Sequence, residues 1–160
     1  GHLRAMQRHT IEVFADYHQL LLVDEEMVYS GLIPKWTKDT LRDRLVSDEG
    51  TVWIGTARNM TVPITVEIHE HEPVSEFRQW DHVAECSVGV RSGTIIVGGL
   101  ADMPPEALRL VVEPSVYRVR VLYGALDSLS EDGLDGEDHY QIQLWKNDNV
   151  VAPTVLKQYA

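Results

Sequence analysis

The feature that most constrains the fold is a two-residue alternation of apolar and polar side chains, which recurs in short segments. The clearest case is residues 61–69, where every second residue is apolar: Val62, Ile64, Val66 and Ile68. Successive side chains of a β-strand point to opposite faces, so this period indicates strands with one buried side.

Similar segments recur along most of the chain, with turn residues at intervals of about 8–12 residues. They cover residues 10–15, 20–23, 51–57, 84–90, 94–97, 108–112, 117–123, 140–144 and 154–159. This pattern predicts an all-β fold. We expect an antiparallel β-sandwich, jelly-roll-like, with about eight to ten strands and one short helix.

The one helix that we expect begins after Thr37, which can serve as its N-cap. Asp39 suits the positive end of the helix dipole, and Leu41 and Leu45 lie four residues apart. Gly50 would close the segment.

Two proline positions punctuate the strand pattern. Pro63 lacks the N–H that a central strand needs, which predicts an edge strand or a bulge. Met103, Pro104 and Pro105 interrupt the pattern further on.

The chain has 160 residues, which is typical of one domain with a substantial core. We expect residues 10–160 to form a single β-sandwich domain and residues 1–9 to form an N-terminal arm. The segment before Met6, Gly1-His2-Leu3-Arg4-Ala5, is interpreted as a cloning scar.

The charge balance indicates which kinds of partner the chain can bind. The chain carries 14 basic and 25 acidic residues, a formal net charge of −11, and has no basic tail. Direct nucleic-acid binding is disfavoured because it depends on Lys and Arg neutralising phosphates. A basic protein partner is favoured, since opposite fields speed encounter.

Cellular location follows from two observations. No apolar run approaches the roughly 20 residues that span a bilayer, so we expect no membrane association. The single cysteine, Cys86, rules out an internal disulfide and fits a reducing compartment. We therefore expect a cytoplasmic protein.

The most acidic segment lies at residues 126–138, between two well-patterned strands. No Lys or Arg occurs from Val121 to Trp145. The carboxylates of such a loop repel one another. The loop can serve to bind a cation, to bind a basic partner, or only to keep the chain soluble. Its six carboxylates are the main candidate contact residues: Asp127, Glu131, Asp132, Asp135, Glu137 and Asp138.

Calcium is one alternative use of this loop. The EF-hand pattern fails, because neither His139 nor Ile142 supplies the final carboxylate when Gly133 or Gly136 takes the central position. A calcium site at a sandwich edge needs no such pattern. A small-ligand module that binds calcium or carbohydrate, helped by exposed tryptophans, therefore stays open.

Metal binding, nucleophilic catalysis and phosphate binding find little support in the sequence. His69 and His71 lie two apart as in a cupin, but His69 belongs to the outward set of its strand, so we expect no metal site. Cys86 lies in an inward apolar row with His82 and is expected to be core. No G-x-S-x-G elbow or Gly-rich phosphate loop occurs. We expect no cofactor and no enzymatic activity.

A second candidate contact patch is Tyr17 and His18, within the polar segment Asp16–Gln19. Tyr and His join apolar bodies to hydrogen-bonding tips and suit interfaces. A corner in which both residues bond to the backbone is the structural alternative.

Three segments carry a family resemblance. Tyr17-His18-Gln19 precedes an apolar residue, Ala57-Arg58-Asn59 precedes a strand, and Val116-Tyr117-Arg118-Val119 follows a turn. In these segments the chain resembles the bacterial competence protein J family, inhibitors of the DNA-entry nuclease. The resemblance implies a non-enzymatic protein whose partner is a basic nuclease or toxin, with its active site covered by the acidic chain.

Overall fold

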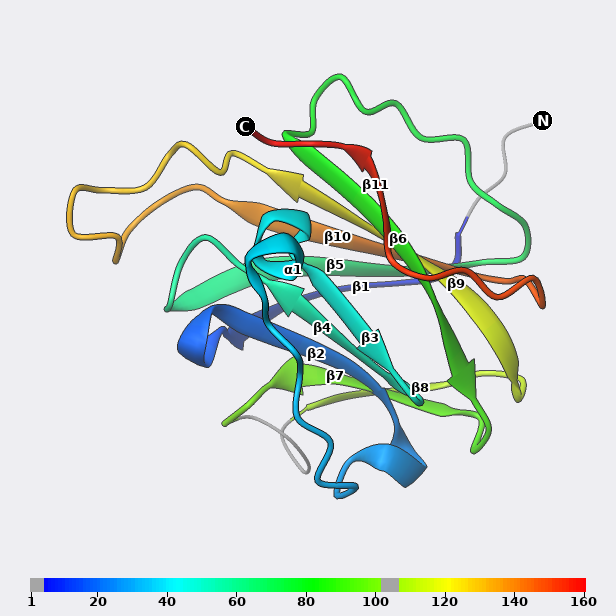
Figure 1. The fold of residues 1–160 in the computed structure, drawn as a ribbon. Coiled ribbons are helices and arrows are strands. Elements are labelled where there is room, and N and C mark those ends of the chain that lie inside the picture. The colour runs from blue at the N-terminus through cyan, green and yellow to red at the C-terminus, as the bar shows by residue number, and fades with distance from the viewer. Residues whose placement is uncertain (1–4, 102–106) are drawn as a thin grey trace.

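The computed structural model describes residues 5–101 and 107–160. Two β-sheets pack face to face (Figure 1), which confirms the all-β sandwich. The larger sheet runs in the order β1 (Ala5–Phe14), β5 (Thr61–His69), β10 (His139–Lys146), β9 (Ser115–Gly124), β6 (His82–Val90) and β11 (Thr154–Lys157). The smaller sheet runs in the order β3 (Leu45–Asp48), β4 (Thr51–Gly55), β2 (Gln19–Asp24), β7 (Thr94–Gly99) and β8 (Leu108–Val111).

The described residues thus contain eleven strands, slightly more than expected, and one α-helix, α1 (Lys38–Asp43). Two short 3-10 turns, η1 (Asp16–His18) and η2 (Glu25–Met27), flank β2. No helix in the described ranges is long and apolar enough to cross a membrane.

The core lies between the two sheets. Val62, Ile64 and Val66 of β5 are fully buried there, as their alternation predicted. Burying each such side chain stabilises the fold by about 1.5–3 kcal/mol.

One strand pair departs from the antiparallel expectation. β5 and β10 run parallel, with Ile64 opposite Tyr140 and Val66 opposite Ile142. A two-residue period gives the buried face of a strand but not its direction. No tight turn joins these two strands, so nothing in the local sequence indicated that they pair or in which direction.

The short helix begins as predicted. The Thr37 hydroxyl accepts the N–H of Thr40, and the Thr40 hydroxyl accepts the N–H of Thr37. The helix ends at Asp43, with Arg44 as its C-cap, earlier than expected, and Leu45 already belongs to β3. Leu41 is 61% exposed, so the predicted pairing of Leu41 with Leu45 on one helix face is wrong.

Pro63 lies on β5, which is an interior strand, so the edge-strand prediction is wrong. It faces Glu12 of β1, and the pairing with β10 begins only at Ile64. The missing N–H therefore sits where β5 has a neighbour on one side only.

The first strand begins earlier in the chain than the sequence predicted. β1 begins at Ala5 and pairs with β5, so residues 5–9 lie in the sheet instead of forming an arm. Residues 1–4, and the break predicted at Met103, Pro104 and Pro105, lie outside the described residues.

Residues 70–81 contain no helix or strand and cover the outer face of the larger sheet. His69 is buried beside them, with Nε2 2.9 Å from Glu67 Oε1, and not at a solvated strand end. Arg120 donates hydrogen bonds to the Pro73 carbonyl (3.0 Å) and to Glu72 (2.9 Å). These contacts fix the segment to the sheet.

A candidate protein-binding surface

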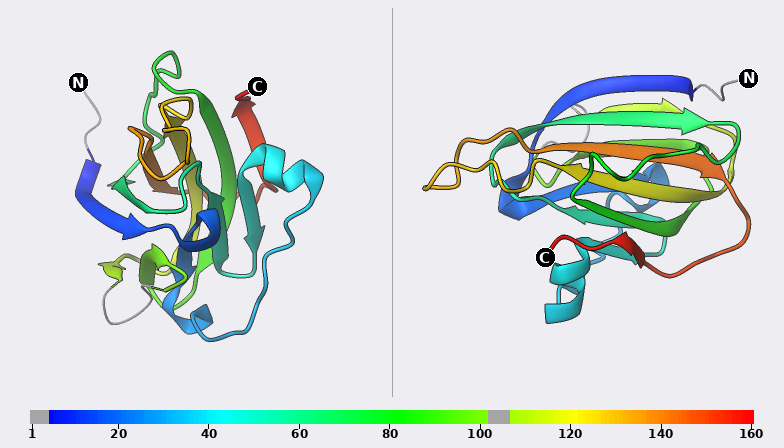
Figure 2. Two further views of the ribbon diagram at one scale, coloured as in Figure 1. Left: turned by 90° about the vertical axis from the view of Figure 1, so that its left-hand side faces the viewer. Right: turned by 90° about the horizontal axis from the view of Figure 1, so that it is seen from above.

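The acidic loop joins β9 to β10 and extends beyond the end of the sandwich (Figures 1 and 2). Five of the six candidate carboxylates are exposed: Asp127, Glu131, Asp132, Asp135 and Glu137. Asp138 is fully buried.

The loop is held in shape by its own hydrogen bonds. The Ser130 N–H donates to the Asp135 carbonyl (2.8 Å), and the Glu137 N–H donates to Ser128 Oγ (2.8 Å). The Asp135 N–H donates to Ser130 Oγ (3.0 Å). The backbone that carries the exposed carboxylates is therefore held in a defined conformation.

Among the five, Asp132 is the one whose carboxylate accepts hydrogen bonds from the described residues. Oδ1 accepts a hydrogen bond from the Ser130 hydroxyl (2.7 Å) and another from the Leu134 N–H (3.0 Å). These bonds, that from Ser130 first, lower the pKa of Asp132. The side chain is thus charged at neutral pH.

Asp138 anchors the loop and is not available to a partner. Its Oδ1 lies 2.7 Å from Arg58 Nε, and its Oδ2 accepts the Tyr140 hydroxyl at 2.6 Å. The same Tyr140 oxygen accepts the Ala57 N–H at 2.8 Å. Burial, and then the bond to Asp138, raise the pKa of Tyr140. The loop base is thereby attached to the β4–β5 connection.

This contact was not visible in the sequence. The absence of Lys and Arg between Val121 and Trp145 suggested a loop without a basic neighbour. The cation, Arg58, comes from a distant part of the chain that the parallel β5–β10 pair brings alongside.

Tyr17 and His18 lie in η1, at the same end of the sandwich (Figure 1). Both have left-handed backbones, with φ of 56° and 61°. His18 Nδ1 lies 3.3 Å from the Thr56 carbonyl oxygen, and the Thr56 N–H donates to the His18 carbonyl (2.9 Å). The corner is therefore bonded through His18, while Tyr17 is 71% exposed.

A groove of about 410 Å³ lies beside this corner. Sequence reasoning missed three of its lining residues, Trp36, Leu41 and Arg44. Trp36 donates its indole N–H to Gln19 Oε1 (3.0 Å), and the Arg44 guanidinium lies 5.1 Å from the centre of the Tyr159 ring. Nothing in the sequence indicated this groove, because Leu41 was expected to pair with Leu45 and its exposure appears only in the structure.

Backbone strain gathers at this groove. Within the described residues, the non-glycine residues with positive φ are Tyr17, His18, Arg44 and Ala125. The first three line the groove, and Ala125 precedes Leu126, which also lines it. Each costs about 1 kcal/mol or more, and such residues concentrate at functional sites.

Calcium and carbohydrate binding gain no support from the geometry. Across residues 5–101 and 107–160, which include the whole loop, no three His, Cys, Asp or Glu side chains come together to hold a metal ion. Trp53 and Trp145 are buried, and Trp36 and Trp80 are partly buried.

Cys86 and His82 do not form a catalytic pair. Cys86 is buried in the core, and burial, with the neighbouring Glu85, raises its pKa to about 12. The two His82 ring nitrogens contact the Asp43 carbonyl (2.8 Å) and the Tyr159 N–H (3.1 Å).

The structure therefore defines a two-sheet β-sandwich with an ordered acidic loop at one end. No protein-family model and no curated protein sequence matches the chain. Two solved structures share its fold. One is ComJ of Bacillus subtilis, described as an inhibitor of the DNA-degrading activity of NucA. It has 14% sequence identity and a TM-score of 0.67, over 92% of this chain and 100% of that chain.

The second is the product of crocagin biosynthetic gene J, with 14% identity and a TM-score of 0.54. The match covers 89% of this chain and 99% of that chain. The resemblance to the competence protein J family, expected from the sequence, is thus confirmed as a distant one at the level of the fold.

Proposed function

We propose that this chain is a non-enzymatic binding protein that inhibits a nuclease by covering its basic active site with the acidic end of the sandwich. The observation that carries the proposal is the ordered loop, which holds five exposed carboxylates on a hydrogen-bonded backbone. The similarity to ComJ, a nuclease inhibitor, over that protein's full length supports it.

The physical basis is imitation of phosphate charge. A nuclease active site uses Lys and Arg to bind the DNA backbone. Carboxylates at fixed positions meet the same cations, raising the association rate and selecting a complementary surface. A loop that is ordered before binding loses less conformational entropy on complex formation.

The contact surface that we propose combines charge with one aromatic side chain. Asp127, Glu131, Asp132, Asp135 and Glu137 supply the charge. Tyr17, with His18 beside it, supplies an exposed ring at the same end of the molecule. Tyrosine is enriched among the residues that contribute most to protein interfaces. Asp138 acts as the anchor of the loop.

The test is DNA cleavage by a nuclease encoded beside this chain, with the purified chain titrated in. We expect cleavage to fall as a stoichiometric complex forms, without any binding of the chain to DNA. Inhibition that persists only while the chain itself binds DNA, or DNA cleavage by the chain alone, would refute the proposal. A cytoplasmic location and the absence of a cofactor stay predictions from the sequence.

A further inference from the structure

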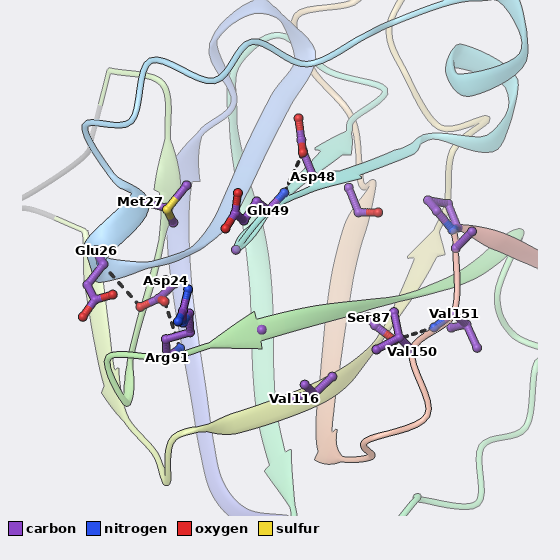
Figure 3. Close-up of a pocket in the computed structure, with 15 residues that line it drawn as sticks. Asp24, Glu26, Met27, Asp48, Glu49, Ser87, Arg91, Val116, Val150 and Val151 are labelled. Carbon is purple, nitrogen blue, oxygen red and sulfur yellow. Dashed lines mark hydrogen bonds between the residues drawn. The ribbon is translucent and has the colours of Figure 1, made fainter.

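A second surface lies at the opposite end of the sandwich from the acidic loop. A groove of about 600 Å³ opens between the β3–β4 turn, β6 and the segment that precedes β11 (Figure 3). It reaches Val116 near the start of β9, whereas the loop follows Gly124 at the end of that strand. The rise of a strand puts these points roughly 25 Å apart.

The floor of this groove contains an unpaired stretch of strand edge. β6 pairs with β9 along its length but with β11 only at residues 83–85. The Ser87 N–H still donates to the Val151 carbonyl (3.2 Å). β6 therefore lacks a neighbour on this side from Gly89 onward, although Val150 and Val151 still line the groove beside it.

The register shows where the backbone of Gly89 points. Gly89 faces Val116, whose carbonyl accepts the Asn147 N–H on the far side of β9 (3.0 Å). Gly89 and Val116 are therefore a non-hydrogen-bonded pair, and the N–H and C=O of Gly89 point away from β9. Within the described part of the chain, neither group has a hydrogen-bond partner.

On the face of the sheet where a side chain would stand, the space at Gly89 is open, and along the edge its carbonyl oxygen lies 3.6 Å from where a Cβ of Gly50 would stand. A Cβ added at Gly89 would meet no atom within 4 Å. Further along the edge, the Arg91 N–H is already bonded to the buried Asp24 carboxylate (2.9 Å). One donor and one acceptor thus remain, at a glycine, where another backbone can approach closely.

The rim of the groove is acidic and its walls are apolar. Glu26, Asp48 and Glu49 are exposed, and none forms an ion pair with a residue that the structure describes. With Asp24 they put four carboxylates into the lining of the groove, together with the guanidinium of Arg91 (Figure 3). The apolar lining comes from Met27, Val116, Val150, Val151 and Pro153.

We propose that this groove binds an extended, Lys- or Arg-containing segment of a partner protein. The segment pairs its backbone with the N–H and C=O of Gly89 and places a basic side chain against Glu26, Asp48 and Glu49. Strand addition of this kind takes affinity from main-chain hydrogen bonds and specificity from side-chain pockets. The surface is separate from the acidic loop, and the proposal does not rest on the inhibitor function.

The test uses the peptide acetyl-Thr-Val-Arg-Val-Lys-Thr-amide and site-resolved amide exchange by NMR. In the free protein the Gly89 amide exchanges faster than the Val88 amide, which faces β9 and is the internal control. With peptide at about ten times its dissociation constant, Gly89 exchange slows by about tenfold while Val88 is unchanged.

Matched variants locate the site. Glu49→Lys weakens peptide binding by about three- to tenfold, whereas Glu12→Lys, with the same change of net charge on β1, leaves it unaltered. A backbone N-methylated peptide binds at least about tenfold more weakly than its parent. The proposal is overturned if the N-methylated peptide binds equally well or if Gly89 exchange does not slow. It is also overturned if the NMR chemical-shift changes caused by the peptide are concentrated at residues 126–138.

Discussion

Replacing Asp138 with asparagine tests whether a buried ion pair holds the base of the acidic loop. Asparagine keeps the size of the side chain and an acceptor for the Tyr140 hydroxyl, but it removes the charge opposite Arg58. Breaking a buried pair costs about 3–5 kcal/mol, because the remaining charge is left unpaired. The Arg58 side chain is 12% exposed, so water can reach it in part.

We therefore expect Asp138→Asn to lower the free energy of unfolding by about 2–3 kcal/mol, just below that range, because water partly solvates the unpaired Arg58. For a chain of this length the melting temperature falls by about 4–12 °C. Urea unfolding followed by tryptophan fluorescence measures the change. Asp135→Asn, in the exposed part of the same loop, is the matched control and shifts stability by less than about 0.5 kcal/mol.

A second variant separates the ion pair from packing. Adding Arg58→Met to Asp138→Asn removes the unpaired charge while keeping a long apolar side chain, so part of the lost stability returns. If Asp138→Asn unfolds within about 0.5 kcal/mol of the parent protein, the pair does not anchor the loop and the reasoning is wrong.

Three further predictions concern titrating groups. Cys86, with its pKa raised to about 12 by burial, resists thiol-specific reagents at neutral pH until the protein unfolds; modification at the rate of a free thiol would contradict this. Ser130→Ala removes the main cause of the lowered pKa of Asp132, so an NMR titration should show that pKa rising toward its ordinary value. Burial lowers the pKa of His82 in the folded state, so the unfolded chain binds more protons and stability falls as the pH drops below about 6.5. His82→Gln should flatten that fall in pH-dependent urea unfolding, and an unchanged slope would assign it to other groups.

The buried faces of the strands could be read from the sequence because burial on one side imposes a period of two. Val62, Ile64 and Val66 illustrate this. The neighbours of each strand could not be read in the same way. Pairing β5 with β10 depends on segments far apart in the chain, and the period carries no information about them.

The candidate site was predicted in part for the same reason. Charge patterning located the acidic loop and a polar break located Tyr17 and His18, but neither showed that the fold places them at one end (Figure 1). Asp138 looked like its five acidic neighbours until Arg58 was brought beside it. The left-handed backbone of Tyr17 and His18 has no marker in residues of this type.

The central claim is that the acidic loop binds the nuclease, and the dissociation constant of their complex tests it most directly. A triple variant, Glu131→Gln, Asp132→Asn and Asp135→Asn, removes three exposed charges. A control triple, Glu12→Gln, Asp39→Asn and Asp148→Asn, removes three exposed charges from other parts of the surface. We predict that the loop variant weakens the complex by about 10- to 100-fold and reduces its salt dependence, while the control changes it by less than about threefold. Equal effects of the two triples, or no effect of the loop triple, would contradict the account.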